Sequence, residues 1–168
     1  LRRIPGTQAR LVWACDLPSY HYRLRRQFAR TAQYALGLLP LAAHSSPFIL
    51  YLSRAHGAAH RRSLGASLNG LEATLKQDPR VRVLDDIGHL ALRDLAKQVA
   101  SARGLAGASG SAMFHMTWLH PSAHVFVFFP VPSGTQYGYL WLHAHSLGLN
   151  YHHVRSLEEW TVALRASL

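Results

Sequence analysis

Residues Val99–Pro130, VASARGLAGASGSAMFHMTWLHPSAHVFVFFP, predict a strand, a turn, a helix and a second strand in close succession. Arg103–Ala106 is a short apolar run, and Gly107–Ser111 is a turn of residues with little or no side chain. Ala112–Leu119 has the composition of a buried helix. Val125–Phe129 is a continuous run of β-branched and aromatic residues, which is typical of a strand covered on both faces in a parallel sheet.

The small-residue turn is a candidate anion-binding site. A turn of this kind that opens a helix leaves backbone N–H groups facing outward, and the helix dipole favours negative charge there. Gly107, Ser109, Gly110 and Ser111 are therefore candidate contacts to the phosphates of a nucleotide or nucleotide-sugar. A close-packed turn without a ligand has the same composition, so both interpretations remain open.

The rest of the chain alternates between predicted strands and predicted helices. The further strands are expected at Arg10–Cys15, Phe48–Ser53, Val81–Leu84 and Asn150–Val154. The further helices are expected at Tyr20–Leu38, Ala66–Lys76, Leu90–Ala102, Thr135–Leu147 and Leu157–Leu168, the last with Ser156 as its N-cap. This alternation predicts an α/β fold, a Rossmann-like parallel sheet with helices on both faces, forming one domain over residues 1–168.

Arginines follow the strand Phe48–Ser53 in the basic loop Arg54–Ser63. In parallel sheets, ligands bind beyond the carboxyl ends of the strands, where this loop and the small-residue turn are both expected to lie. Guanidinium groups bind phosphate oxygens in a forked geometry. Arg54, Arg61 and Arg62, together with the turn, are the residues we expect to hold a diphosphate.

The chain is strongly basic, with 18 Lys and Arg residues against 8 acidic ones and a formal net charge of +10. Its densest basic cluster lies in the predicted helix Tyr20–Leu38, where Leu24 and Phe28 mark the apolar face. Arg23, Arg26 and Arg30 share a second, polar face because they are three and four residues apart. That face is a candidate contact to RNA or to an acidic protein surface, and a solvated helix face is the alternative.

Metal, disulfide and membrane-spanning classes are not favoured. A single cysteine, Cys15, excludes an internal disulfide, and the 12 histidines show no spacing that supplies three or four ligands with a supporting carboxylate. We therefore expect no metal site. The apolar runs are broken by Arg, His, Pro or Gly before they reach the length of a membrane span, so no span is expected.

The order of these motifs resembles the C-terminal half of glycosyltransferase family 61. The similar segments run from the helix YRLRRQFARTA to the strand LGLNYHHV, over about Tyr20–Val154. They include a strand that ends in Ser-Arg, an arginine pair, a glycine-rich turn and two later segments. In this chain these read LYLSR (Leu50–Arg54), Arg61-Arg62-Ser63, GASGSAM (Gly107–Met113), WLHPSAHV (Trp118–Val125) and VFFP (Val127–Pro130).

The resemblance implies one half of a GT-B glycosyltransferase, the half that binds a nucleotide-sugar donor without a metal at the diphosphate. By motif position, Arg54 and Arg62 match the family's arginines, and Gly107 and Gly110 match the glycines of its turn. The acceptor and the catalytic base would come from an N-terminal domain that is expected to be separate or missing here. No catalytic residue is assigned, and the compartment would be the lumen of the Golgi or endoplasmic reticulum.

Four departures from the family pattern favour an alternative. Ser109 replaces a histidine, Val127 a glutamate and Leu95 a glutamine, while Leu64-Gly65-Ala66 stands where Asn-Glu is typical. We expect these four positions to share one pocket, and an unpaired polar partner there costs about 1–3 kcal/mol. The alternative is a catalytically inactive transferase fold that serves as a basic binding module. Its setting would be a ribonucleoprotein such as a ribosome, in an organelle or the cytoplasm.

Overall fold

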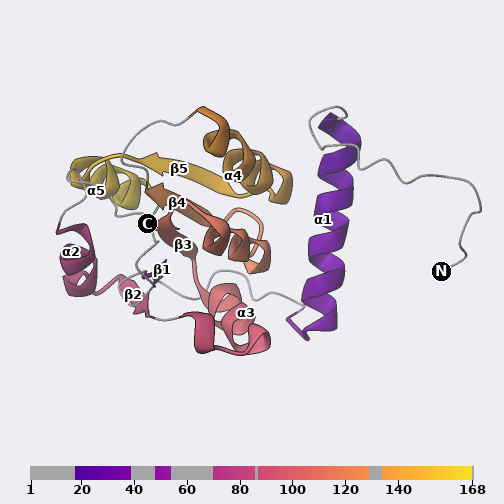
Figure 1. The fold of residues 1–168 in the computed structure, drawn as a ribbon, viewed down its shortest axis with the longest axis horizontal. Coiled ribbons are helices and arrows are strands. Elements are labelled where there is room, and N and C mark those ends of the chain that lie inside the picture. The colour runs from indigo at the N-terminus through magenta and orange to yellow at the C-terminus, as the bar shows by residue number, and fades with distance from the viewer. Residues whose placement is uncertain (1–17, 39–47, 54–69, 86, 129–133, 168) are drawn as a thin grey trace, which may run out of the picture.

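The computed structural model describes residues 18–38, 48–53, 70–85, 87–128 and 134–167. Within these ranges, five parallel strands form one sheet with helices on both faces (Figure 1), as the sequence predicts. The strands are β1 (Ile49–Leu52), β2 (Val81–Leu84), β3 (Gly104–Ala108), β4 (His124–Phe128) and β5 (Asn150–Val154). The α-helices are α1 (Pro18–Ala35), α2 (Leu71–Gln77), α3 (Leu92–Ser101), α4 (Gly134–Leu147) and α5 (Leu157–Ala166), and two 3₁₀ helices are η2 (Ile87–His89) and η3 (Ser111–Trp118).

The strand order is β2-β1-β3-β4-β5. β1 pairs with both β2 and β3, so that Leu50 lies opposite Arg82 on one side and Leu105 on the other. The order reverses between β1 and β3: β2 lies next to β1 on one side, and β4 and β5 follow β3 on the other. In a doubly wound sheet, the place where the order reverses is where a ligand crevice forms, beyond the carboxyl ends of the two central strands.

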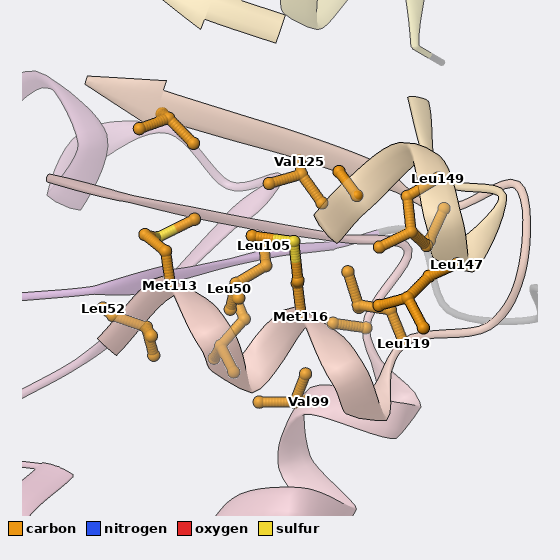
Figure 2. Close-up of a cluster of buried hydrophobic side chains, with 14 of the residues drawn as sticks. Leu50, Leu52, Val99, Leu105, Met113, Met116, Leu119, Val125, Leu147 and Leu149 are labelled. Atoms are coloured by element: carbon orange, nitrogen blue, oxygen red, sulfur yellow. The ribbon is translucent and has the colours of Figure 1, made fainter. Parts of the chain in front are cut away.

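One face of the sheet is covered by α3, η3 and α4. Figure 2 shows Met113 and Met116 rising from η3 towards the strands, where they meet Leu105 and Val125, with Val99 of α3 beneath. All five of these side chains are fully buried. Three residues per turn place Met113 and Met116 on one line, so the 3₁₀ form directs both towards the sheet.

The other face is covered by α2 and α5. Leu71 and Leu75 of α2 and Trp160 of α5 pack on this side, and the indole of Trp160 meets the ring of Phe126 edge-on at 5.0 Å between centroids. Ser156 caps α5 by accepting a hydrogen bond from the Glu159 N–H at 3.2 Å, which confirms the predicted N-cap.

Two local predictions need correction. The strand predicted at Arg103–Ala106 runs instead over Gly104–Ala108, so Gly107 and Ala108 belong to β3 and the turn is shorter than expected. The helix predicted at Ala112–Leu119 has the 3₁₀ form, whose three residues per turn direct both Met113 and Met116 towards the sheet.

The faces of α1 are the reverse of the prediction. Leu24 and Phe28 are 44 % and 73 % exposed, whereas Ala29 and Gln33 are buried. The small Ala29 lets α1 approach its neighbours, and polar side chains beside it satisfy carbonyl groups at the ends of η3 and α4. Helix ends leave such carbonyls without an intrahelical partner, so a polar face can be the inward one.

Several predictions lie outside the described residues. These are the strand Arg10–Cys15 with its cysteine, the loop Arg54–Ser63, the first part of the helix Ala66–Lys76, and Phe129 at the end of the predicted strand.

Candidate functional site

The carboxyl ends of β1 and β3 meet at the point where the strand order reverses. Leu52 is paired with Gly107, so Ser53 and Ser109 follow the last residues of the two strands. The Ser53 N–H donates to the Leu84 carbonyl of β2 at 3.0 Å, and the Ser109 N–H donates to the Phe128 carbonyl of β4 at 3.1 Å. Four adjacent strands thus fix the position of this edge through backbone hydrogen bonds.

Gly107 allows η3 to fold back tightly onto β3. A Cβ atom at this position would lie 2.8 Å from the Met113 sulfur and 3.5 Å from the Leu52 carbonyl oxygen. Because Met113 is fully buried, its side chain has little room to move away. A glycine here is therefore a packing requirement of the connection.

Gly110 has a different role, because its backbone has φ 153° and ψ −173°. Side-chain-bearing residues essentially never adopt this region, so Gly110 sets the direction in which the chain enters η3. The first N–H groups of η3, from Ser111 and Ala112, have no carbonyl partner within the helix. Such N–H groups at a helix start suit an anionic ligand.

Glu72 is a candidate site residue that the sequence analysis missed. It lies in the first turn of α2, and its carboxylate accepts a hydrogen bond from the Ser53 hydroxyl at 2.8 Å. Lys76 pairs with the same carboxylate oxygen at 3.3 Å. Among the described residues, both of these contacts are made by the same carboxylate oxygen, Oε1. No local sequence signal marks Glu72, because its contact joins it to a residue 19 positions earlier in the chain.

The predicted site residues fall into separate places. Gly107, Ser109, Gly110 and Ser111 form one connection at the carboxyl edge, although Gly107 is a strand residue rather than part of the turn. Arg54 and Arg62 lie outside the described residues.

The arginines of the other predicted cluster lie on α1, and the contacts of α1 are with the C-terminal ends of η3 and α4. Figure 1 shows α1 beyond the amino ends of β4 and β5, whose arrowheads point away from it. Arg23, Arg26 and Arg30 are all exposed, and the Nε of Arg26 donates to the Ser146 carbonyl at 3.2 Å. The two predicted clusters are therefore on opposite edges of the sheet.

The structure describes three of the four positions that depart from the family pattern. Val127 and Leu95 are both buried in the apolar cluster between the sheet and the helices α3, η3 and α4. Ser109 follows the end of β3, and Leu64-Gly65-Ala66 lies outside the described residues, so a pocket shared by all four positions stays a prediction. Polar side chains at positions 95 and 127 would be buried among apolar groups, which explains the apolar residues found there.

Burial lowers the pKa of several histidines in the fold. Burial, with a smaller contribution from the charge of Arg25, lowers the pKa of His143 to about 4, and its Nε2 lies 2.9 Å from the Thr117 hydroxyl. His124 and His152 form a hydrogen-bonded pair at 2.9 Å, and burial lowers the pKa of His152.

The described residues contain no cluster of three or more His, Cys, Asp or Glu side chains suited to a metal ion. Within the same residues, every helix is too short or too polar to cross a membrane.

The sheet, its reversal point and the glycine-dependent connection define a Rossmann-like α/β fold. A comparison with protein families then matches the model of glycosyltransferase 61 to residues 7–126. Because this match covers more than half of the 168 residues, the chain belongs to glycosyltransferase family 61. The matched region ends within β4, so α4, β5 and α5 lie beyond it. A search of curated proteins found no match to this chain.

Proposed function

We propose that this chain is the donor-binding part of a family 61 glycosyltransferase and binds a nucleotide-sugar at the carboxyl ends of β1 and β3. The observation that carries the proposal is the glycine-dependent connection from β3 to η3, located where the strand order reverses. Family membership supports glycosyl transfer as the class of chemistry. The proposed ligand contacts are Arg54, Arg62, Gly107, Ser109, Gly110 and Ser111.

The chemistry of the transfer explains why cations and N–H groups are needed. An acceptor hydroxyl attacks the anomeric carbon of the sugar, the bond from that carbon to the diphosphate oxygen breaks, and a nucleoside diphosphate leaves. Negative charge grows on the diphosphate in the transition state, and oriented donors that face it lower the barrier. Arg54, Arg62 and the first N–H groups of η3 are proposed to face the diphosphate. A second domain is proposed to supply the acceptor and the base that takes its proton.

Glu72 is proposed to accept hydrogen bonds from the ribose hydroxyls of the donor. Its position in α2, next to the end of β1, puts a carboxylate at the same edge as the glycine connection. An ionised carboxylate has about four acceptor positions, and the contacts from Ser53 and Lys76 leave room for two more. This carboxylate would supply the acidic partner for which the sequence analysis found no candidate.

Isothermal titration of the full chain with nucleoside diphosphates and UDP-sugars tests the proposal. We expect saturable binding in the wild type. Binding should be at least about tenfold weaker in Arg54→Ala/Arg62→Ala, because each substitution removes charge-assisted hydrogen bonds to the ligand. The matched control is Arg93→Ala/Arg165→Ala, which removes the same charge from exposed positions on α3 and α5 and should bind as the wild type does. No binding to the folded chain at millimolar ligand overturns the proposal.

A second candidate function is an inactive fold that binds RNA through α1. The observation that favours it is that Arg23 and Arg30 are exposed on a helix that contains no acidic residue. A single-stranded RNA oligonucleotide in the same titration panel tests this candidate. Binding of the RNA that weakens steeply with salt, without any binding of the nucleotides, would replace the first proposal with the second.

A further inference from the structure

A groove of about 590 Å³ lies between α1 and the segment that joins η3 to β4. Arg26, Arg30 and Tyr34 of α1 line one side, and Leu119, Pro121 and Leu147 line the other. Residues 119 and 121 precede β4, and residue 147 ends α4 just before β5, so the groove lies at the amino ends of these strands. The proposed donor site is at the opposite edge, and the two sites are independent of each other.

The groove has an apolar floor. Leu119, Leu147 and Ala29 line it and are buried, with exposed fractions of 3 %, 7 % and 4 %. The ring of Tyr34, by contrast, is 77 % exposed at the side of the groove. A volume of this size, a largely apolar lining and a few polar groups are the usual features of small-molecule sites.

The charge of the groove is positive. Arg26 and Arg30 line it, and its lining includes no acidic residue among the described side chains. Within the described part of the chain, Arg30 has no acidic partner. Arg26 uses its Nε to hold the Ser146 carbonyl, which leaves four of the five guanidinium N–H donors.

The spacing of the two arginines favours a tetrahedral anion. Residues four apart on a helix have Cβ atoms about 5–6 Å apart, so two guanidinium groups can approach one group from different sides. A carboxylate is planar and is satisfied by a single guanidinium fork, whereas a phosphate presents oxygens in diverging directions to both. We propose that this groove binds an organic phosphate, with the phosphate on Arg26 and Arg30 and an apolar or aromatic body over Leu119 and Leu147 beside Tyr34.

NMR titration of the ¹⁵N-labelled full chain with phenyl phosphate tests the proposal. We expect saturable shifts in the amides of Arg30, Leu119 and Leu147, and binding about tenfold weaker in Arg30→Gln. Arg23→Gln is the matched control, because it removes the same charge from an exposed position on the same helix that does not line the groove. Its affinity should equal that of the wild type. Tyr34→Ala, at a second exposed position, should weaken the binding of phenyl phosphate without unfolding the chain.

Three further ligands identify the source of the phosphate and the contribution of the apolar floor to binding. Inorganic phosphate should bind at least about tenfold more weakly than phenyl phosphate, since it gains nothing from the apolar floor. Uridine monophosphate with the same residue pattern would point to a nucleotide, and a short-chain phosphatidic acid that binds in preference would point to a lipid phosphate.

Three results would overturn the proposal. The first is the absence of saturable shifts at about 10 mM phenyl phosphate in a folded chain. The second is equal binding of inorganic phosphate, and the third is equal weakening by Arg23→Gln and Arg30→Gln. The last result would mean that the whole basic face of α1 attracts anions, as an RNA-binding helix does. The groove test and the donor titration fail separately, because they use different ligands and different variants.

Discussion

At the scale of single residues, Gly107 has a testable role in holding η3 against β3. In Gly107→Ala, the new methyl group would lie 2.8 Å from the sulfur of the fully buried Met113. We expect the free energy of unfolding to fall by about 1–3 kcal/mol, as is usual when a packed interior receives an extra group. Urea unfolding followed by circular dichroism measures this change.

The control for this glycine is Gly138→Ala. Gly138 lies in α4 and is exposed, and no atom would come within 4 Å of a Cβ added there. Alanine has the better helix propensity, so this variant should gain up to about 1 kcal/mol. A Gly107→Ala variant as stable as the wild type would show that η3 does not pack on β3 as described.

At the scale of elements, α1 is attached to the domain through the ends of other helices. Gln33 donates from Nε2 to the carbonyls of Thr117 at 2.8 Å and of Leu119 at 3.4 Å, and Arg26 holds the end of α4. In Gln33→Ala, these η3 carbonyls lose their partner, at a cost of about 1–3 kcal/mol. We expect faster amide exchange in α1 and at the end of η3, with protection of β3 and β4 unchanged.

Gln27→Ala is the matched control, since it changes the same residue type at an exposed position of the same helix. Its exchange pattern should equal that of the wild type. Uniform loss of protection across the sheet in Gln33→Ala would instead mean that α1 is an inseparable part of the core.

The elements also show what the sequence could predict. The bounds of β2 and the cap of α5 follow from local chemistry: two valines at alternate positions for the strand, and a serine three residues before a glutamate for the cap. The bounds predicted for β5 are also confirmed. The inward face of α1 could not be predicted, because the carbonyls it satisfies belong to helices about 100 residues away in the chain. Glu72 was missed for a similar reason, since its contact with Ser53 depends on the fold.

At the scale of the whole molecule, the two edges of the sheet carry different chemistry. The carboxyl edge has the glycine connection and the Glu72 carboxylate, and the amino edge has the arginine-lined groove. The glycine turn lies at the edge expected from the sequence, because the carboxyl ends of parallel strands meet at one edge. The position of the α1 arginines could not be predicted, because a helix that precedes β1 is free to pack at either end of the sheet.

The stability of the whole molecule should fall in mild acid because of His143. Burial, then the charge of Arg25, lowers the pKa of His143 from 6.5 to about 4. The Thr117 hydroxyl donates its hydrogen to the Phe114 carbonyl. Its oxygen therefore accepts a hydrogen bond from the Nε2–H group of a neutral His143. Below pH 6.5 the unfolded chain therefore binds a proton that the folded chain does not. The stabilisation present above that pH is lost as the pH falls towards 4, by about 2 kcal/mol between pH 7.5 and pH 5.

Urea unfolding of His143→Gln at the same two pH values isolates this contribution. The amide can keep a hydrogen bond to Thr117 but does not titrate, so the variant should lose about 2 kcal/mol less than the wild type between pH 7.5 and pH 5. Burial also lowers the pKa of His115 and His152, so a smaller acid sensitivity should remain. His145→Gln, on the same helix at an exposed position, should lose stability as the wild type does. If His143→Gln loses as much stability as the wild type between pH 7.5 and pH 5, this histidine is not held neutral between α4 and η3. The packing described for these two helices would then be wrong.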